Sequence, residues 1–270
     1  MLDYDFMRTA FMAGGLVAIV AGSVGYVLVL RNLTFAGHAL SHVGFAGATG
    51  SVLIGASPLW GLLALTVAAA IAMGLLGDRL RGRDVAVGII LSLALGLGVL
   101  FLSLYSTHAT RATAILFGNV LGISRETVWA LLGLTVVSVC ALASISRPLL
   151  FATLAPELAE AKGVSLRLVS VLFLVIVAVA VAEAAQVVGV LLVFVLMVGP
   201  AAAALRLTSR IGWGLGLAVV LALGETWLGL ALAYTTDWPT SAWIVLLSCA
   251  VYFLSLMPWR DHPSRSESSG

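Results

Sequence analysis

The sequence contains very little charge. Only 10% of its 270 residues are Asp, Glu, Lys or Arg, whereas 61% are hydrophobic and the mean hydropathy is +1.15. Soluble globular domains carry roughly 25% charged residues, so this composition excludes an ordinary soluble domain. Lipid cannot satisfy backbone hydrogen-bonding groups, so long apolar runs are expected to cross the bilayer as helices. The sequence therefore predicts an all-α fold, a polytopic membrane helix bundle.

Cysteine and lysine are also scarce, and both shortages exclude functions. The two cysteines, Cys140 and Cys249, lie in apolar runs, which indicates packing and not a disulfide. Lys162 is the only lysine and does not follow a glycine-rich loop, so the chain has no P-loop for ATP. No basic patch with interleaved aromatic residues indicates nucleic-acid binding. Energy for active transport would have to come from a partner or an ion gradient.

The apolar runs predict about nine transmembrane helices, most of them close to the roughly 20 residues that cross a bilayer. The expected sixth span is short, and its boundary with the seventh is the weakest of these assignments. We expect residues 1–260 to form a single transmembrane domain and residues 261–270 a disordered cytoplasmic tail. The expected spans are 9–30, 34–54, 58–77, 85–104, 127–146, 167–183, 187–205, 211–233 and 240–257.

The basic residues predict an orientation. Cytoplasmic loops of membrane proteins carry an excess of Lys and Arg. If the N-terminus is outside, all but three of the 14 basic residues are cytoplasmic, the exceptions being Arg8, Arg111 and Arg125. We therefore expect an outside N-terminus and, with nine crossings, a cytoplasmic C-terminus.

Two connections are long enough to contain structure of their own. Residues 105–126 include a short apolar run, 115–123, which is typical of either a re-entrant segment or an ordinary surface helix. The cytoplasmic connection 147–167 contains Pro156, which suits a first helical turn, and Gly163, which suits a helix end. This pattern predicts a short amphipathic helix along the membrane surface between the fifth and sixth spans.

Two histidines are the most distinctive polar residues within a span. In a helix, His38 and His42 lie one turn apart on the same face. Gly44 and Gly47 lie roughly opposite, where small residues let another helix approach closely. The imidazoles indicate a pathway for a metal ion, although two neutral histidines hydrogen-bonded to neighbouring helices would give the same pattern. The spacing resembles the HExxH motif of zinc peptidases, but Ala39 replaces the glutamate that acts as general base.

Two acidic residues and one proline are further candidates. Glu183 ends the expected sixth span and Glu225 lies inside the eighth. Ionisable groups in a bilayer usually face a cavity or a partner. Each glutamate is therefore either neutral and hydrogen-bonded, or a carboxylate that attracts a divalent cation into the path. In the seventh span, Pro200 follows Gly199 and permits a kink, which serves packing, gating or both.

Four segments together resemble the permease subunit of ATP-binding-cassette importers for zinc, manganese and iron. They are residues 37–50, 116–123, 156–163 and 187–204, and the resemblance spans 9–257 in order and spacing. It implies a homodimer in the bacterial inner membrane, two cytosolic ATPase subunits that use ATP, and an extracytoplasmic metal-binding protein. The chain itself would be a transport subunit and not an enzyme, with Zn²⁺ or Mn²⁺ as cargo and no permanent cofactor.

The resemblance also implies residue roles and shows two departures. His38 replaces a usual acidic residue, and Ala155 replaces a frequent acidic residue in the coupling helix that contacts the ATPase. Because imidazole suits zinc whereas carboxylates suit manganese, His38 favours Zn²⁺, with Mn²⁺ next. The assigned residues are His38, His42, Glu183 and Glu225 for the ion path, Pro156, Glu157, Leu158, Ala159 and Gly163 for ATPase coupling, and Gly199 and Pro200 for a gating hinge.

Two other classes of function remain open from the sequence. A self-contained secondary metal-ion transporter would usually show internal repeats with broken helices in matching positions, and no convincing repeat is visible. An intramembrane metalloenzyme would need a glutamate near the histidine pair and an open coordination position on the metal.

Overall fold

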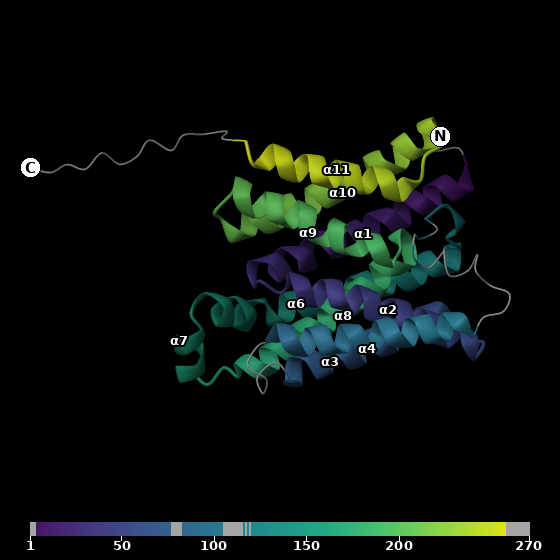
Figure 1. Cartoon of the computed structure of the whole chain (residues 1–270). Coiled ribbons are helices and arrows are strands. Elements are labelled where there is room, and N and C mark those ends of the chain that lie inside the picture. Colours follow the sequence, from purple (N-terminus) through teal and green to yellow (C-terminus); the bar gives the residue numbers. More distant parts are fainter. Residues whose placement is uncertain (1–3, 77–82, 105–115, 117, 119, 258–270) are drawn as a thin grey trace, which may run out of the picture.

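The computed structural model describes residues 4–76, 83–104, 116, 118 and 120–257. Within these residues every regular element is a helix, which confirms the predicted all-α class. The long helices run side by side as a bundle, and the chain starts α1 at one end and finishes α11 at the other (Figure 1). The expected tail, 261–270, lies outside the described residues, as do positions 115, 117 and 119 of the apolar run 115–123.

Nine long helices and two short ones make up the described part of the chain. The long ones are α1 (Asp5–Leu30), α2 (Thr34–Leu53), α3 (Pro58–Leu76), α4 (Arg83–Ser103), α6 (Arg125–Leu154), α8 (Leu166–Val188), α9 (Val190–Leu207), α10 (Ile211–Thr236) and α11 (Thr240–Ser255). The short ones are a 3₁₀ turn, η1 (Val120–Gly122), and α7 (Pro156–Ala161). Seven of the long helices have the length and hydropathy of a membrane span; α2 is less apolar, and α11 has 16 residues. The expected count of nine is thus approximate.

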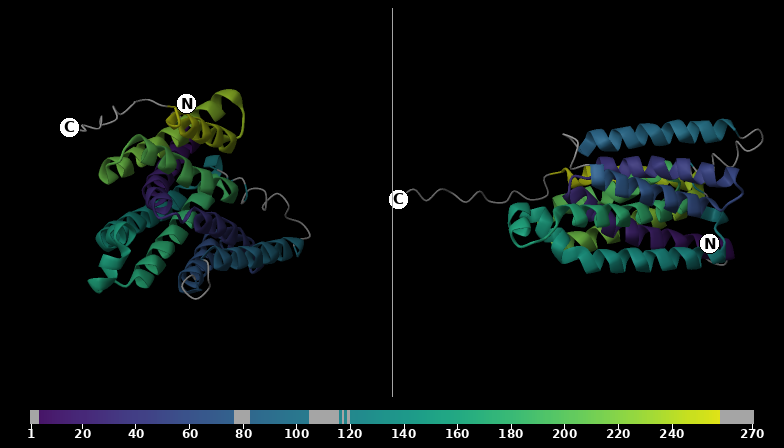
Figure 2. Two further views of the ribbon diagram at one scale, coloured as in Figure 1. Left: turned by 60° about the vertical axis from the view of Figure 1, so that its left-hand side comes forward. Right: turned by 90° about the horizontal axis from the view of Figure 1, so that it is seen from below.

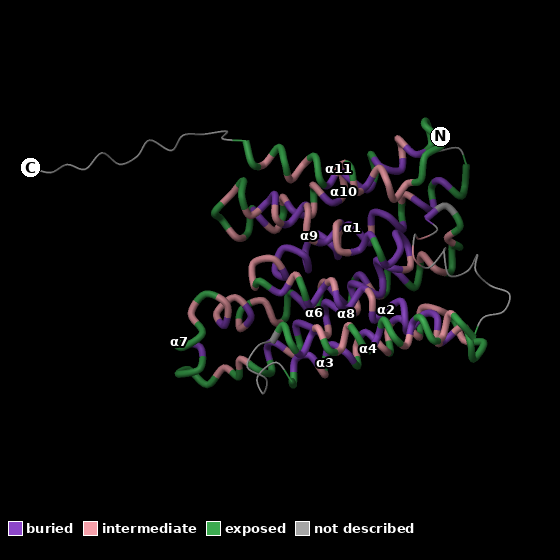
Figure 3. The backbone as a smooth tube through the Cα atoms, viewed as in Figure 1, coloured by how far each residue is buried: buried purple, intermediate pink, exposed green. Residues whose placement is uncertain are grey.

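Helix α1 is the centre of the bundle. It packs against α10, α9, α6 and α8, and it lies in the middle of the ribbon in Figure 2. Two glycines allow these close contacts: a Cβ on Gly22 would lie 2.6 Å from the Val219 Cα of α10, and one on Gly25 would overlap the Met197 carbonyl of α9. Figure 3 shows buried backbone concentrated in these inner helices and exposed backbone at the outer ones.

The expectation of a short sixth span is wrong. Helix α8 has 23 residues and continues past Glu183 to Val188. Nothing in the run of alanine and valine after Glu183 ends a helix, and the break comes only at Gly189, which has φ 85°. Gly118, also in the left-handed region at φ 78°, lies against the backbone at this break. Positive φ at both positions favours glycine, since a side chain there would be strained.

The predicted short helix between the fifth and sixth spans is confirmed as α7. Pro156 occupies its first turn, and Gly163, with φ 83°, follows its end. Helix α7 lies outside the bundle, at the end where α11 finishes (Figure 1). In the chain it lies between α6 and α8. Helix α6 continues through Pro148 and ends at Leu154.

Candidate functional site

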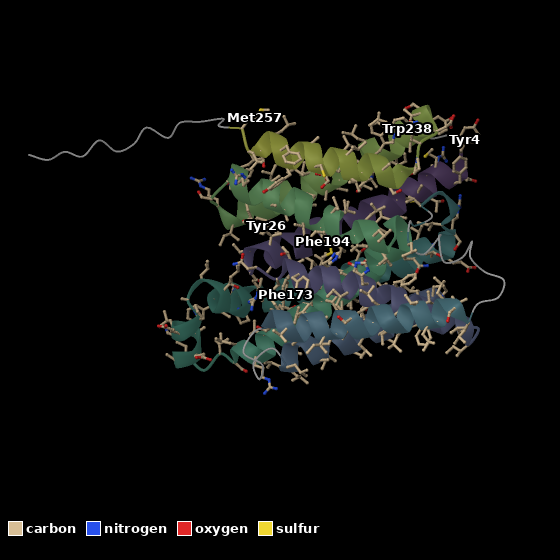
Figure 4. The ribbon with its side chains drawn as sticks, viewed as in Figure 1. Tyr4, Tyr26, Phe173, Phe194, Trp238 and Met257 are labelled. Carbon is tan, nitrogen blue, oxygen red and sulfur yellow. The ribbon has the colours of Figure 1, made fainter. Side chains whose placement is uncertain are left out.

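The histidine pair forms the polar part of α2. The ring centroids of His38 and His42 are 4.7 Å apart, with the rings nearly perpendicular at 84°. The His38 ring also contacts the Phe194 ring of α9. The two ring centroids are 5.1 Å apart, and the ring planes are inclined at 73°. Figure 4 places Phe194 in the middle part of the bundle, between the end marked by Tyr4 and the end marked by Met257. The predicted common face of the two imidazoles is therefore confirmed.

The environment of the pair suits a reversible ion site. Both histidines are half-buried, so both residues are partly accessible in the single chain. Among the described residues, neither imidazole has a hydrogen-bond partner, which argues against two histidines that only tie neighbouring helices together. Neutral imidazole nitrogens are good ligands for first-row divalent metals. No group of three or more His, Cys, Asp or Glu side chains gathers in the described part of one chain.

The other face of α2 holds the helix in place. A Cβ on Gly44 would lie 2.8 Å from the Leu62 side chain of α3, and one on Gly47 would overlap the Gly61 carbonyl. This confirms the predicted close approach of another helix to the glycine face. Because α3 contacts α2 backbone to backbone there, the imidazoles are presented from a firmly packed support.

Glu183 is fully buried and has one partner. It lies on α8 with a relative exposure of 0% and accepts a hydrogen bond from the Thr135 hydroxyl of α6. Its second carboxyl oxygen has no partner among the described residues. A group with no exposure in the single chain has no route to exchange ligands with water, so the geometry favours a structural role in joining α6 to α8.

Glu225 is equally buried but lies in another part of the bundle. It is 2% exposed on α10, and α10 is not among the helices that pack closely on α2. The Ser248 hydroxyl of α11 lies beside its carboxyl group but donates to the Val195 carbonyl, at 3.3 Å. Neither Glu225 carboxyl oxygen has a hydrogen-bond partner in the described structure. The structure thus does not bring Glu225 to the histidine pair.

Gly199 and Pro200 lie at the contact between α9 and α11. A Cβ on Gly199 would overlap the Ser248 hydroxyl, so glycine is what allows α11 to approach this closely. Helix α9 continues through Pro200, which is buried. The same stretch of α9 carries Phe194, so a change of bend at Pro200 would move the ring that contacts His38.

Helix α7 presents a mixed surface. Glu157 and Leu158 are exposed, Leu158 at 53%, whereas Ala159 is buried at 0%. Glu157 and Leu158 are therefore side chains of α7 that a partner outside the bundle could contact. Of the residues assigned to coupling, Ala159 faces the protein and supports the helix, so it offers no contact surface to a partner.

The fold defines the chain as a multi-span helical membrane protein with its polar groups at helix faces. It belongs to the ABC 3 transport family, which matches residues 3–258. It is 30% identical to the "Manganese transport system membrane protein MntC" of Halalkalibacterium halodurans, over 94% of this chain and 88% of that one. It is 32% identical to the "Probable metal transport system membrane protein" of Treponema pallidum, over 94% and 96%.

Solved structures have the same fold. The structure described as "PsaBC from Streptococcus pneumoniae in complex with Fab" superposes with a TM-score of 0.84 and 26% identity, covering 93% of this chain and 91% of that chain. A second, "An inward-facing conformation of a putative metal-chelate type ABC transporter", has a TM-score of 0.71 and 16% identity and supports the fold alone.

Sequence reasoning missed one polar centre, around Arg31. This residue counted only as a cytoplasmic charge, yet its guanidinium donates to Thr153 of α6 and Ser170 of α8. The only sequence signal was an arginine directly after an apolar helix, which is ordinary for a membrane protein.

Proposed function

We propose that the chain is the permease subunit of an ATP-driven importer that moves a divalent transition-metal ion into the cytoplasm. The observation that carries this proposal is the His38–His42 pair, half-buried and without hydrogen-bond partners in the described structure, in a member of the ABC 3 transport family. Relatives named for manganese and metal transport support the cargo class.

Energy and capture are supplied by partners in this proposal. A cytosolic ATPase subunit binds the exposed face of α7, Glu157 and Leu158, and hydrolyses ATP, because the chain itself has no P-loop. An extracytoplasmic metal-binding protein delivers the ion. Two copies of the chain form a homodimer around the path, so that four imidazoles face the ion. The chain forms and breaks no covalent bond, and its task is to bind, orient and release.

The orientation belongs to the same proposal. The N-terminus is outside and α7 is cytoplasmic, as the basic residues predict. A cysteine placed at Ser124, before α6, should react with an impermeant thiol reagent added to intact cells, and one at Ser165, before α8, should not. Both variants are made in a background with Cys140 and Cys249 replaced by alanine. Labelling of Ser165→Cys from outside would reverse the orientation and remove α7 from the cytoplasm.

The transport cycle follows from the packing. The imidazoles of α2 coordinate the ion transiently. A site with so few ligands binds the ion weakly enough to release it. Closure of the ATPase pair displaces α7, and the helices move between outward-open and inward-open states. Gly199 and Pro200 act as the hinge. Helix α9 touches α11 at Gly199, and Phe194, which contacts His38, precedes this point on the same helix.

Two considerations favour different ions. The imidazole pair favours zinc, as the sequence predicted, whereas the names of the relatives favour manganese. Competitive uptake of Zn²⁺ and Mn²⁺ by the same vesicles decides between them. The sequence assigned Glu183 and Glu225 to the ion path, whereas their burial argues for support of the bundle.

The test is uptake by the complex reconstituted into vesicles with its ATPase and binding protein. We expect accumulation of Zn²⁺ or Mn²⁺ that requires ATP, and its loss when Glu157 and Leu158 are both changed to glycine. Arg210→Gln, an exposed change at the same end of the bundle, is the matched control and should transport normally. Accumulation by the chain without the ATPase, driven by an ion gradient, would replace the proposal with a secondary transporter.

A further inference from the structure

Arg31 occupies the turn between the central helix and the helix that carries the histidines. Helix α1 ends at Leu30, Arg31 follows as its cap, and α2 begins at Thr34, one turn before His38. The turn is tight, with Asn32 in the left-handed region at φ 54°. A displacement of Arg31 therefore reaches the histidine helix through very few bonds.

The Arg31 guanidinium reaches across the bundle to both neighbours of α7. One terminal nitrogen donates to the Thr153 hydroxyl at 3.0 Å and to the Leu149 carbonyl at 3.4 Å, both on α6. The other donates to the Ser170 hydroxyl of α8 at 3.0 Å. The guanidinium carbon lies 5.7 Å from the centre of the Phe173 ring, also on α8, within the range of a cation–π contact.

These contacts bracket the short helix. Thr153 comes two residues before Ala155, the cap of α7, and Ser170 lies in the first turns of α8 that follow it. The planar, forked guanidinium holds both arms in a fixed relation, which a lysine could not do. One side chain thus ties the α6–α7–α8 segment to the α1–α2 turn.

We infer that Arg31 is the positioning residue that transmits displacement of α7 to the histidine-bearing helix α2. This inference rests on the proposed function, because it assumes that an ATPase moves α7. When α7 shifts, Thr153 and Ser170 carry the guanidinium with them, and the α1–α2 turn follows. Helices α1 and α2 also pack on α8, and Arg31 adds a polar link at the turn that joins them.

The test compares transport with hydrolysis in the reconstituted complex. In Arg31→Gln, metal-stimulated ATP hydrolysis should persist, while metal ions moved per ATP should fall severalfold, because the neutral amide loses the charge-assisted hydrogen bonds to α6 and α8. The pair Thr153→Val and Ser170→Ala, which leaves the arginine in place, should lower the ratio in the same direction. Arg31→Lys should restore little of it, because an ammonium group cannot bridge both arms. Arg210→Gln again is the control.

The outcomes separate this inference from the proposed function. If the parent complex shows no ATP-driven uptake, the proposed function fails. If the parent transports and both sets of variants keep the parental ratio of transport to hydrolysis, Arg31 is only a structural cap and the inference is overturned. A fall in protein yield with an unchanged ratio of transport to hydrolysis in the folded fraction also counts against the inference. If Arg31→Gln does not fold, the double variant Thr153→Val with Ser170→Ala decides.

A separate observation concerns a groove on the outer surface, between α1, α6 and α10. It has a volume of about 850 Å³, and its walls are mainly apolar, with Met12 and Trp129 strongly exposed. The Trp227 indole donates to the Phe11 carbonyl at 3.2 Å and closes the floor between α10 and α1. An apolar groove of this size fits acyl chains.

One end of the groove is charged. Asp5, Arg8 and Arg125 line it where α1 and α6 begin, and Arg125 pairs with Asp5 at 3.2 Å in an exposed ion pair. Two arginines and one aspartate therefore line this end of an otherwise apolar groove. We propose that it binds an anionic phospholipid, with the phosphate at Arg8 and Arg125 and the acyl chains along Met12 and Trp129.

The lipid proposal is tested on the full chain purified from membranes. Native mass spectrometry in mixed phosphatidylglycerol and phosphatidylcholine should show retained phosphatidylglycerol, reduced severalfold by Arg8→Gln with Arg125→Gln and by Met12→Trp, which fills the groove. Arg147→Gln, exposed at the far end of α6, should retain it. Equal retention of both lipids, or no change in the variants, would overturn the proposal, as would protection of the groove by a second copy of the chain.

Discussion

The imidazoles of α2 and the carboxyl groups of α8 and α10 are all ionisable groups inside the bundle, yet they differ in access. His38 and His42 are half-buried; their rings contact each other, and the His38 ring contacts Phe194. Glu183 and Glu225 are at most 2% exposed, and Glu183 is held by Thr135. Being ionisable within the membrane is therefore not enough to identify a path residue.

Access to water and freedom from protein partners decide which of these groups can exchange an ion. A transient ligand must meet water or cargo on one side and must not be tied up by a protein partner. A carboxyl group enclosed by helices instead imposes a cost of burial that the surrounding packing must offset. The histidines satisfy the first description and the glutamates the second. We therefore predict loss of transport from changes at the histidines, and loss of stability from changes around the glutamates.

The largest effect is expected for His42→Ala. It should abolish metal uptake nearly completely, while the melting temperature of the purified protein in detergent changes little, because the ring has no hydrogen-bond partner to abandon in the described structure. Uptake is measured per folded molecule in vesicles. A large fall in melting temperature with normal uptake in the remaining protein would mean that the histidine only packs.

Gly199→Ala should have the next largest effect, on stability. The added methyl group would overlap the Ser248 hydroxyl, and overpacking of this kind costs about 1–3 kcal/mol. Thermal unfolding in detergent measures it. Gly224→Ala is the matched control, because a Cβ there meets open space, and it should be neutral or slightly stabilising. Equal melting temperatures for the two variants would contradict the close α9–α11 contact.

Thr135→Val should destabilise without affecting the path. It removes the hydroxyl that donates to Glu183 and leaves the carboxyl group with no partner, at a cost of about 1–3 kcal/mol. Uptake per folded molecule should stay at the parental value. If uptake falls while stability holds, Glu183 belongs to the ion path, as the sequence first suggested.

The smallest expected change is in the preference between Mn²⁺ and Zn²⁺. His38→Asp replaces one imidazole with a harder carboxylate and should raise the ratio of Mn²⁺ to Zn²⁺ uptake severalfold. Competitive uptake in the same vesicles measures the ratio. An unchanged ratio would show that selectivity is set away from α2.

The sequence predicted features that depend on local spacing. Residues one turn apart share a helix face, so the histidine stripe and its glycine-rich opposite face followed directly. The start and stop of α7 at Pro156 and Gly163 followed from the backbone preferences of proline and glycine. These signals lie within a few residues of one another, which is why they could be read without a structure.

Contacts between distant segments could not be predicted in this way. The partners of Arg31 lie 122 and 139 residues away in the chain, and Glu183 bonds to a residue 48 positions earlier. Periodicity contains no information on such pairs. The end of α8 was also missed, because a buried glutamate looks like a span boundary although the backbone breaks only at Gly189.

The central claim, that His38 and His42 line the ion path, is tested most directly by X-ray absorption on the zinc-loaded complex. We predict imidazole nitrogen ligands at about 2.0–2.1 Å from the metal, lost when both histidines are changed to alanine. The same imidazole signal in the double variant, or a signal from oxygen ligands alone in the parent, would contradict the account.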